Sequence, residues 1–232
     1  MRLWGGLAAV TLGVSACSEL PGIEGPEGEV RSEITVTSDR VILRGPQGFC
    51  IDPESSTHRP SQAFIVFGNC AAIAGDEELP QPFVNAVAVA TVLPSRRDVP
   101  SIASSELELA EFFQTDDGRR VLSATDDAAT VEVLDSFTRN GAFFIHARDK
   151  SGAQLAGTDD TFWRGYFDVK KSLVAVSVLG LSKTPLSSSD GLQTLYDFGN
   201  AIREGQEAET PTPKSTNPDD VENTGLLRRL FG

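Results

Sequence analysis

The sequence predicts an α+β fold in which an antiparallel sheet, built from consecutive hairpins, has two helices packed on one of its faces. Two hairpin patterns follow one another between residues 130 and 179. One helix pattern precedes them and another follows, whereas a parallel α/β sheet would need regular alternation of strands and helices. We therefore expect a single globular domain over residues 33–205.

The clearest local pattern is a hairpin. Two runs rich in β-branched and aromatic residues, 131–138 and 142–147, flank Arg139-Asn140-Gly141. Asn-Gly supplies the positive φ angles that a tight turn between antiparallel strands requires. A second hairpin is predicted over residues 162–179, with its turn at Lys170-Lys171.

Shorter strands are predicted upstream. An apolar run at 40–44 and a turn at 45–48 are followed by residues 49–51, which return as a strand. Further strands are expected at 63–67 and 83–93. The last has small residues at alternate positions, a surface against which a bulky element can pack: Ala86, Ala88 and Ala90.

Both predicted helices begin with capping-box spacing, in which a serine and an acidic residue three positions later satisfy free N–H groups of the first turn. The first helix pairs Ser105 with Glu108 and ends at residues 116–118. The second pairs Ser187 with Asp190.

The second helix has an amphipathic stripe that would face the sheet. Gly199 lies in this stripe and permits a close approach to a neighbouring element, and Gly205 ends the helix. The other members of the stripe are Leu192, Leu195, Tyr196 and Ile202.

The N-terminus has the pattern of an export signal. Arg2 precedes an apolar run at residues 3–14, which is shorter than the roughly 20 residues that span a bilayer. The segment Val14-Ser15-Ala16-Cys17 resembles the lipobox of bacterial lipoproteins. In that family the signal, here residues 1–16, is removed and the cysteine thiol carries a diacylglycerol. The alternatives are an ordinary cleaved signal with an incidental cysteine, and a buried N-terminal helix.

The lipobox resemblance implies a protein of the bacterial cell envelope that faces the periplasm and is held to the membrane by acyl chains on Cys17. Ser18 stands where an aspartate favours inner-membrane retention in enteric bacteria, so we expect the outer membrane rather than the inner one. Residues 17–32, rich in proline, glycine and glutamate, are predicted to form a flexible tether between lipid and domain.

The C-terminal residues 206–232 are predicted to form a disordered acidic tail. Its end, residues 226–231, is a short basic-amphipathic segment. Leu227 and Phe231 are candidate contacts there, either with an envelope protein or with the membrane interface. The alternative is a solvated end with incidental leucines.

Cys50 and Cys70 are the two cysteines left after lipidation. In an oxidising compartment they are expected to form a disulfide, which closes a loop of about 20 residues and contributes roughly 3 kcal/mol by the chain-entropy argument. Two free thiols and a redox pair are the alternatives, although the spacing is not Cys-x-x-Cys.

The chain is acidic, with a formal net charge of −13. Removal of residues 1–16 takes away Arg2 and no acidic residue, so the charge becomes −13 − 1 = −14. Such a surface argues against binding nucleic acid and against electrostatic adhesion to anionic lipid. We found no nucleotide or cofactor motif, so neither a nucleotide nor a cofactor is expected.

Three segments resemble a group of uncharacterised envelope lipoproteins of photosynthetic and marine alphaproteobacteria: residues 48–52, 162–168 and 185–192. The order of hairpins with a closing helix is also similar to the PsbP-type α+β sandwich. Both resemblances rest on packing residues, so they imply a fold and no activity.

Catalytic residues are not marked by any motif. The histidines are His58 and His146, and no Gly-x-Ser-x-Gly segment accompanies them. A Cys50–His58 pair would conflict with the predicted disulfide. Adjacent aspartates lack the spacing of a calcium-binding loop and are expected to serve as helix caps and solvated turns, so no metal site is predicted: Asp116-Asp117, Asp126-Asp127, Asp159-Asp160 and Asp219-Asp220.

The preferred hypothesis is therefore a non-enzymatic envelope module that binds or scaffolds a partner. If their face is exposed, Trp163, Arg164 and Tyr166 are candidate contact residues, and the alternative for these side chains is packing in the core. The second hypothesis is a periplasmic hydrolase with a site near His146 or His58.

Overall fold

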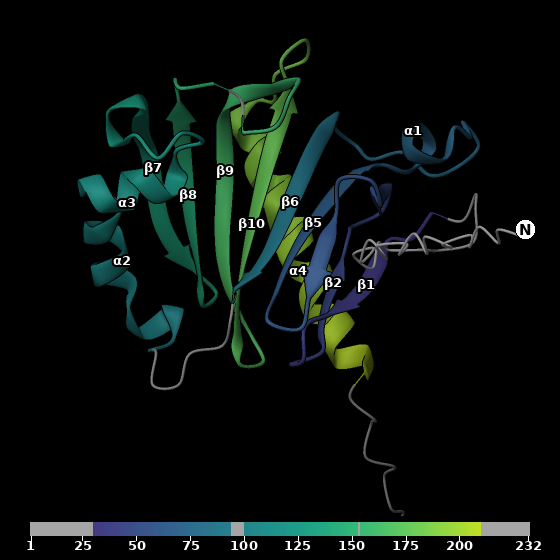
Figure 1. Cartoon of the computed structure of the whole chain (residues 1–232), viewed down its shortest axis with the longest axis horizontal. Helices are drawn as coiled ribbons and strands as arrows, with labels where there is room; N and C mark the ends of the chain where they lie inside the picture. The colour runs from purple at the N-terminus through teal and green to yellow at the C-terminus, as the bar shows by residue number, and fades with distance from the viewer. Residues whose placement is uncertain (1–29, 94–99, 153, 210–232) are drawn as a thin grey trace, which may run out of the picture.

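The computed structural model describes residues 30–93, 100–152 and 154–209, and in them an eight-stranded antiparallel sheet forms the middle layer (Figure 1). The strand order is β3-β5-β6-β10-β9-β8-β7, with β4 paired to β5 beside this path. The strands are β3 (Phe49–Ile51), β4 (Thr57–Arg59), β5 (Gln62–Asn69), β6 (Ala86–Leu93), β7 (Val131–Arg139), β8 (Ala142–Asp149), β9 (Thr158–Val169) and β10 (Ser172–Leu181).

Both faces of this sheet are covered. Helix α4 (Ser188–Glu209) and a two-stranded ribbon of β1 (Glu33–Val36) and β2 (Val41–Arg44) pack on one face. The opposite face carries shorter elements, which are η1 (Ile102–Ser104), α2 (Glu106–Phe112), α3 (Asp116–Leu122) and η2 (Ala128–Thr130).

The predicted α+β class, dominated by antiparallel strands, is confirmed, but the placement of both helices on one face is wrong. Phe143 and Ile145 of β8 lie in one buried cluster with Phe113, next to α2, whereas Phe144 lies in the other with Phe198 of α4. Successive residues of a strand point to opposite faces. A strand that is apolar at successive positions therefore requires cover on both sides.

Both predicted hairpins are present. β7 and β8 are joined by Asn140 and Gly141, with φ angles of 52° and 73°, as a tight turn requires. β9 and β10 are joined through Lys170, with a φ of 54°. These turns are local, so the chain sequence predicts them well.

The pairing predicted between the first two strands is wrong. β2 pairs with β1, and β3 leaves that ribbon to pair with β5 in the large sheet. The small residues of β6 behave as predicted: Ala88 and Ala90 are fully buried in the same cluster as Val36 and Leu43 of the ribbon.

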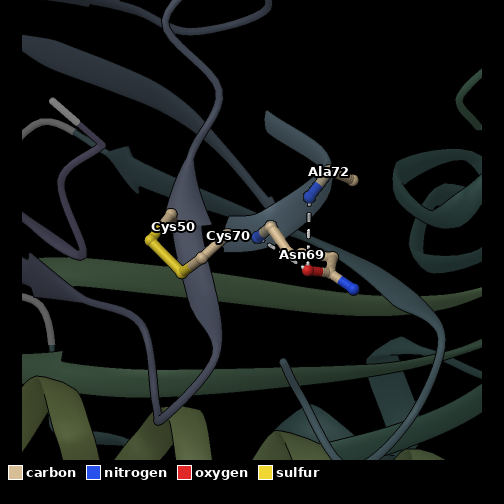
Figure 2. Close-up of a disulfide and its surroundings, with 5 residues drawn as sticks. Cys50, Asn69, Cys70 and Ala72 are labelled. Carbon is tan, nitrogen blue, oxygen red and sulfur yellow. Dashed lines mark hydrogen bonds between the residues drawn. A yellow bond between two sulfur atoms is a disulfide. The ribbon is translucent and has the colours of Figure 1, made fainter. Parts of the chain in front are cut away.

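A disulfide joins Cys50 of β3 to Cys70, the first residue of α1 (Cys70–Ala74), as predicted (Figure 2). Asn69 caps α1, because its side-chain oxygen accepts hydrogen bonds from the backbone of Ala71 at 2.9 Å and of Ala72 at 3.4 Å. The 20-residue separation supports a contribution of roughly 3 kcal/mol from loop closure.

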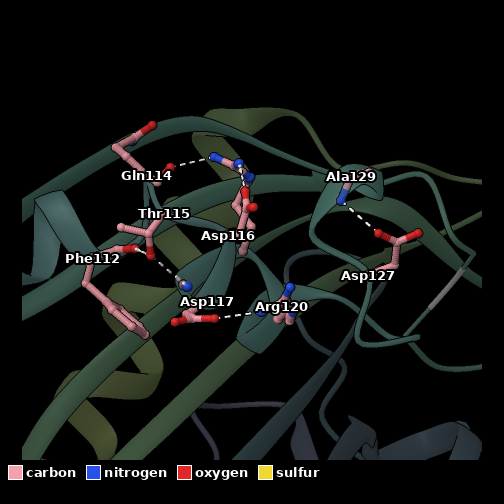
Figure 3. A network of polar contacts seen from close by, with 10 residues as sticks. Phe112, Gln114, Thr115, Asp116, Asp117, Arg120, Asp127 and Ala129 are labelled. Carbon is pink, nitrogen blue, oxygen red and sulfur yellow. Dashed lines mark hydrogen bonds and ion pairs between the residues drawn. The ribbon is translucent and has the colours of Figure 1, made fainter.

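The end predicted for the first helix is wrong, because Asp116-Asp117-Gly118 begins α3 instead. Thr115 caps α3 by accepting a hydrogen bond from Gly118 N at 3.1 Å (Figure 3). Carboxylates in a first turn are favoured by the helix dipole. The Ser105 side chain makes no capping hydrogen bond in the described chain.

Two of the four aspartate pairs, Asp116-Asp117 and Asp126-Asp127, serve as helix starts and turns, as expected. The expectation is wrong for Asp159-Asp160, which lies within β9, and Asp219-Asp220 lies outside the described residues. Asp116 forms an ion pair with Arg119 and Asp117 forms one with Arg120, each at 2.6 Å and three positions along the helix. Asp127 accepts a hydrogen bond from Ala129 N at 2.9 Å and starts η2 (Figure 3).

The start of α4 is confirmed and its end is not. Ser187 Oγ accepts a hydrogen bond from Asp190 N at 3.1 Å, which is the predicted cap. The helix continues past Gly205 to Glu209. A side chain at Gly205 would come within 3.0 Å of Ile42, so this glycine serves close packing against β2 and does not end the helix.

Both predicted domain boundaries move outward. Gln206, expected in the tail, lies in α4 and its side chain hydrogen-bonds the backbone N–H and C=O of Ile42 at 3.2 and 2.6 Å. Arg31 and Ser32, expected in the tether, accept backbone hydrogen bonds from Ile51 and Gly45.

Cys17, Leu227 and Phe231 lie outside the described residues. Within the described parts of the chain, none of the helices combines the length and apolar character needed to cross a membrane.

Candidate ligand-binding site

Trp163 and Tyr166 are core residues rather than exposed contact residues. Their side chains are 4% and 8% exposed and lie on opposite faces of the sheet. Trp163 Nε1 donates to the carbonyl of Ser188 at 2.9 Å, which ties β9 to the start of α4. The hypothesis that these two aromatic side chains form a partner surface is wrong.

Arg164 is half-buried and holds several segments together. Its guanidinium donates to Ser177 Oγ at 2.7 Å, to the Val121 carbonyl at 3.0 Å and to Gln154 Oε1 at 2.8 Å. These contacts anchor the end of α3 to the sheet. These contacts use three of the five guanidinium N–H donors for internal structure.

The two histidines do not form the hydrolytic arrangements considered above. The His146 ring stacks on Trp163, with ring centroids 4.6 Å apart. Burial is the main cause that lowers the pKa of His146, and the nearby Arg148 adds to the effect while Asp135 opposes it. In the described ranges no hydrogen bond joins His146 or His58 to a hydroxyl group.

Cysteine catalysis by Cys50 and His58 is also ruled out in this structure. His58 lies on β4 opposite Ala63, and the Cys50 sulfur is bonded to Cys70. A disulfide sulfur has no thiolate to act as the nucleophile. Among the described residues, no group of three or more His, Cys, Asp or Glu side chains is placed to hold a metal ion.

A pocket of ≈ 270 Å³ lies where the β7–β8 turn meets the side of α4. The turn contributes two residues of its polar lining and the helix contributes the rest. These residues are Arg139, Asn140, Gln193, Tyr196, Asn200 and Arg203. The helical members recur at intervals of three or four residues, so they lie along one side of α4.

The bottom of the pocket is apolar. Phe144 of β8 and Phe167 of β9 are 2% and 5% exposed and belong to the core beneath α4. Gly199 lets the helix approach them, since a Cβ at this position would lie 2.6 Å from a ring carbon of Phe167. The predicted role of Gly199 in close packing is therefore confirmed.

An aromatic ring supports the charged side of the pocket. The Arg139 guanidinium lies over the Tyr196 ring, 5.3 Å from its centroid, and donates to the Tyr196 hydroxyl at 3.4 Å. Phe144 meets the same ring edge-to-face at 5.0 Å. Arg203 donates to Asn200 Oδ1 at 2.5 Å, so both cations are oriented by neutral groups.

Neither Arg139 nor Arg203 forms an ion pair with a carboxylate of the described residues. This distinguishes them from Arg44, Arg119 and Arg120, each of which has a carboxylate oxygen within 2.6 Å. Arg164 likewise has only neutral partners, so what sets Arg139 and Arg203 apart is that both line the same pocket. The arrangement can bind an anionic group, because arginine donates to carboxylate and phosphate oxygens in charge-assisted hydrogen bonds.

No pattern in the sequence predicts this pocket. Asn140, Tyr196 and Gly199 were assigned only to a turn and to packing. One available signal was the polar row Gln193, Asn200 and Arg203, which runs beside Tyr196 at the edge of the apolar stripe of α4. Nothing local indicated that the β7–β8 turn would lie next to it.

Comparison with known proteins gives no family assignment. No protein-family model matches the sequence, and a search of curated proteins found no significant match. Among solved structures, the extracellular domain of PknH from Mycobacterium tuberculosis matches with a TM-score of 0.30 and 12% identity, over 65% of this chain and 66% of that chain. The match therefore spans just under two thirds of the PknH domain's length.

Proposed function

We propose that this protein is a lipid-anchored lipoprotein of the bacterial cell envelope, facing the periplasm from the outer membrane, whose domain binds an anionic ligand without catalysing a reaction. The anchor is proposed from the lipobox-like segment that ends at Cys17, and the outer membrane from Ser18. The binding role is proposed from the pocket between the β7–β8 turn and α4.

One observation supports binding above all: Arg139 and Arg203 line a single aromatic-floored pocket and have no carboxylate partner among the described residues. A ligand with a negative charge would supply the partner that the protein does not. A hydrolase is less well supported, because His146 is stacked on Trp163 and Cys50 is bonded to Cys70.

The anchor is tested by labelling cells that express the full chain with a palmitate analogue. We expect the wild type to take up label and to sediment with outer membranes. Cys17→Ser should lose the label and leave the membrane fraction, whereas Cys50→Ser should keep the label. Equal labelling of wild type and Cys17→Ser would disprove the proposed anchor.

The binding role is tested by measuring how strongly the full chain is retained on a set of immobilised anions. We expect Arg139→Ala and Arg203→Ala to reduce retention at least tenfold. Arg120→Ala is the matched control, because it removes the same charge from an ion pair on α3, away from the pocket. Equal losses for all three variants would show that the pocket is not the site.

A further inference from the structure

The chemistry of the pocket narrows the ligand class, if the proposed anion-binding function holds. We propose that the pocket between the β7–β8 turn and α4 binds a carboxylate attached to an apolar group about the size of one amino-acid side chain. The two sources of such a group are a free small carboxylic acid and the C-terminus of a peptide.

The donors of the pocket fit a planar monoanion. Each guanidinium presents a flat fork of N–H groups that matches the two oxygens of a carboxylate. Side-chain amides of Asn140, Asn200 and Gln193 lie around the same pocket and can donate to a carbonyl or carboxylate oxygen. One of them, Gln193, already donates to Asp197 at 2.9 Å.

Features that favour a phosphate dianion are missing from the described lining. Phosphate groups are commonly held by the free N–H groups at a helix N-terminus. Here the α4 residues of the pocket, 193–203, lie beyond the first turn of a helix that starts at Ser188, where backbone N–H groups are already bonded within the helix. The Asp197 carboxylate nearby further disfavours a second negative charge.

The volume and the apolar floor of the pocket limit the size and type of apolar group that the ligand can carry. Its volume of ≈ 270 Å³ is below the range of about 300–1,000 Å³ that is typical for drug-sized ligands. Phe144, Phe167 and the ring of Tyr196 form the apolar side. An aromatic or branched aliphatic group can therefore pack on the floor while its carboxylate meets the arginines at the rim.

The test is isothermal titration calorimetry on the full chain with N-acetyl-phenylalaninate, its neutral amide, and phenyl phosphate. We expect the acid to bind at least tenfold more tightly than either of the other two. Arg139→Ala and Arg203→Ala should each weaken the acid at least tenfold, and Arg120→Ala should not. Arg139→Lys keeps the charge but loses the planar fork, so it should weaken binding of the acid more than binding of phenyl phosphate. Thermal unfolding of each variant establishes that it is folded.

A pentapeptide ending in phenylalanine, with a free or an amidated C-terminus, identifies the source. Tighter binding of the free-ended peptide than of the acid assigns a peptide C-terminus, and binding of the acid alone assigns a free carboxylic acid. Both results support the ligand class. Tighter binding of phenyl phosphate overturns the carboxylate assignment and leaves the anion-binding function standing. Absence of binding by every anion, or binding unaffected by the two alanine variants, overturns both.

Discussion

The carboxylate of Asp149 shows how one buried residue organises several segments. Its side chain is fully buried and accepts hydrogen bonds from Ala124 N at 2.6 Å, Thr130 Oγ1 at 2.7 Å and Ser151 N at 3.0 Å. Burial by itself raises the pKa of Asp149, but these hydrogen bonds together outweigh burial and hold the pKa below its usual range. The residue thus joins the end of β8 to the segment between α3 and β7.

Asp149→Ala should lower the free energy of unfolding by about 3 kcal/mol, because it leaves buried donors without an acceptor. For a domain of this size that corresponds to a fall in Tm of roughly 6–12 °C, measured by differential scanning calorimetry. Asp117→Ala, which removes an exposed ion pair, is the control and should cost less than about 1 kcal/mol. Equal losses would contradict the role assigned to Asp149.

His146 should make stability depend on pH in the range just below neutrality. Because its pKa is lowered by burial in the folded protein, the unfolded chain binds more protons as pH falls below about 6.5. Stability contributed by neutral His146 is therefore present above the unfolded pKa and is lost as pH falls towards the folded pKa. We expect His146→Gln to show a smaller fall in Tm between about pH 7.5 and pH 5.5 than the wild type.

The control for His146 is His58→Gln, which removes the histidine on β4. If both variants flatten the pH profile equally, burial of His146 against Trp163 is not the cause. Thermal melts at matched ionic strength separate this effect from general screening of the acidic surface.

At the scale of elements, the position of α4 on the sheet depends on residues without side chains. A Cβ at Gly199 would lie 2.6 Å from Phe167, and one at Gly191 would lie 2.9 Å from Trp163. These two contacts explain why α4 tolerates glycines, which disfavour helix interiors by about 1 kcal/mol each. They also place Phe167 against the helix as part of the pocket floor.

Gly199→Ala should therefore lower stability by about 1–3 kcal/mol through overpacking, although helix propensity by itself predicts a gain of about 1 kcal/mol. The free energy of unfolding in urea measures the sign directly. Glu207→Ala, on an exposed part of α4, reports the effect of propensity without the contact. A stabilised Gly199→Ala variant would show that Phe167 yields easily and that the close approach is not required.

Elements were predictable where short-range chemistry decides them. Asn140-Gly141 and Ser187 define a turn and a cap through their own dihedrals and hydrogen bonds. The pairing of β2 with β1 was missed because residues 45–48 read as a hairpin turn, whereas Gly45 instead bonds the Ser32 carbonyl. The start of α3 was missed because Asp-Asp-Gly reads equally as a helix end and as an acidic first turn.

At the scale of the whole molecule, one sheet connects two hydrophobic clusters. Phe144 and Trp163 belong to the cluster under α4 and the β1–β2 ribbon, while Phe143 and Phe162, their chain neighbours, belong to the cluster under η1 and the α2–α3 segment. Disorder in either cluster would destabilise β8 and β9, and the opposite faces of these strands form the other cluster. The two layers of cover should therefore unfold together.

We expect a single cooperative unfolding transition in urea. Fluorescence of Trp163, which would be the single tryptophan left after removal of residues 1–16, and far-UV circular dichroism should give the same midpoint. Separate midpoints, with one layer lost first, would contradict the shared-sheet argument. The disulfide-reduced protein should unfold at lower urea but still in one step, because Cys50 and Cys70 lie at one end of the sheet.

Local patterns were enough to predict the two tight hairpins, the cap of α4 and the close-packing role of Gly199. The disulfide was predictable for a different reason, since Cys50 and Cys70 are the two cysteines left once Cys17 is assigned to the lipid anchor. Packing between distant segments set which face each helix covers, the burial of Trp163 and Tyr166, and the presence of Arg139 and Arg203 in one pocket. The physical reason is the distance along the chain over which each interaction acts. Dihedral preferences and capping bonds act over a few residues, whereas burial and the pocket depend on packing between segments far apart in the chain.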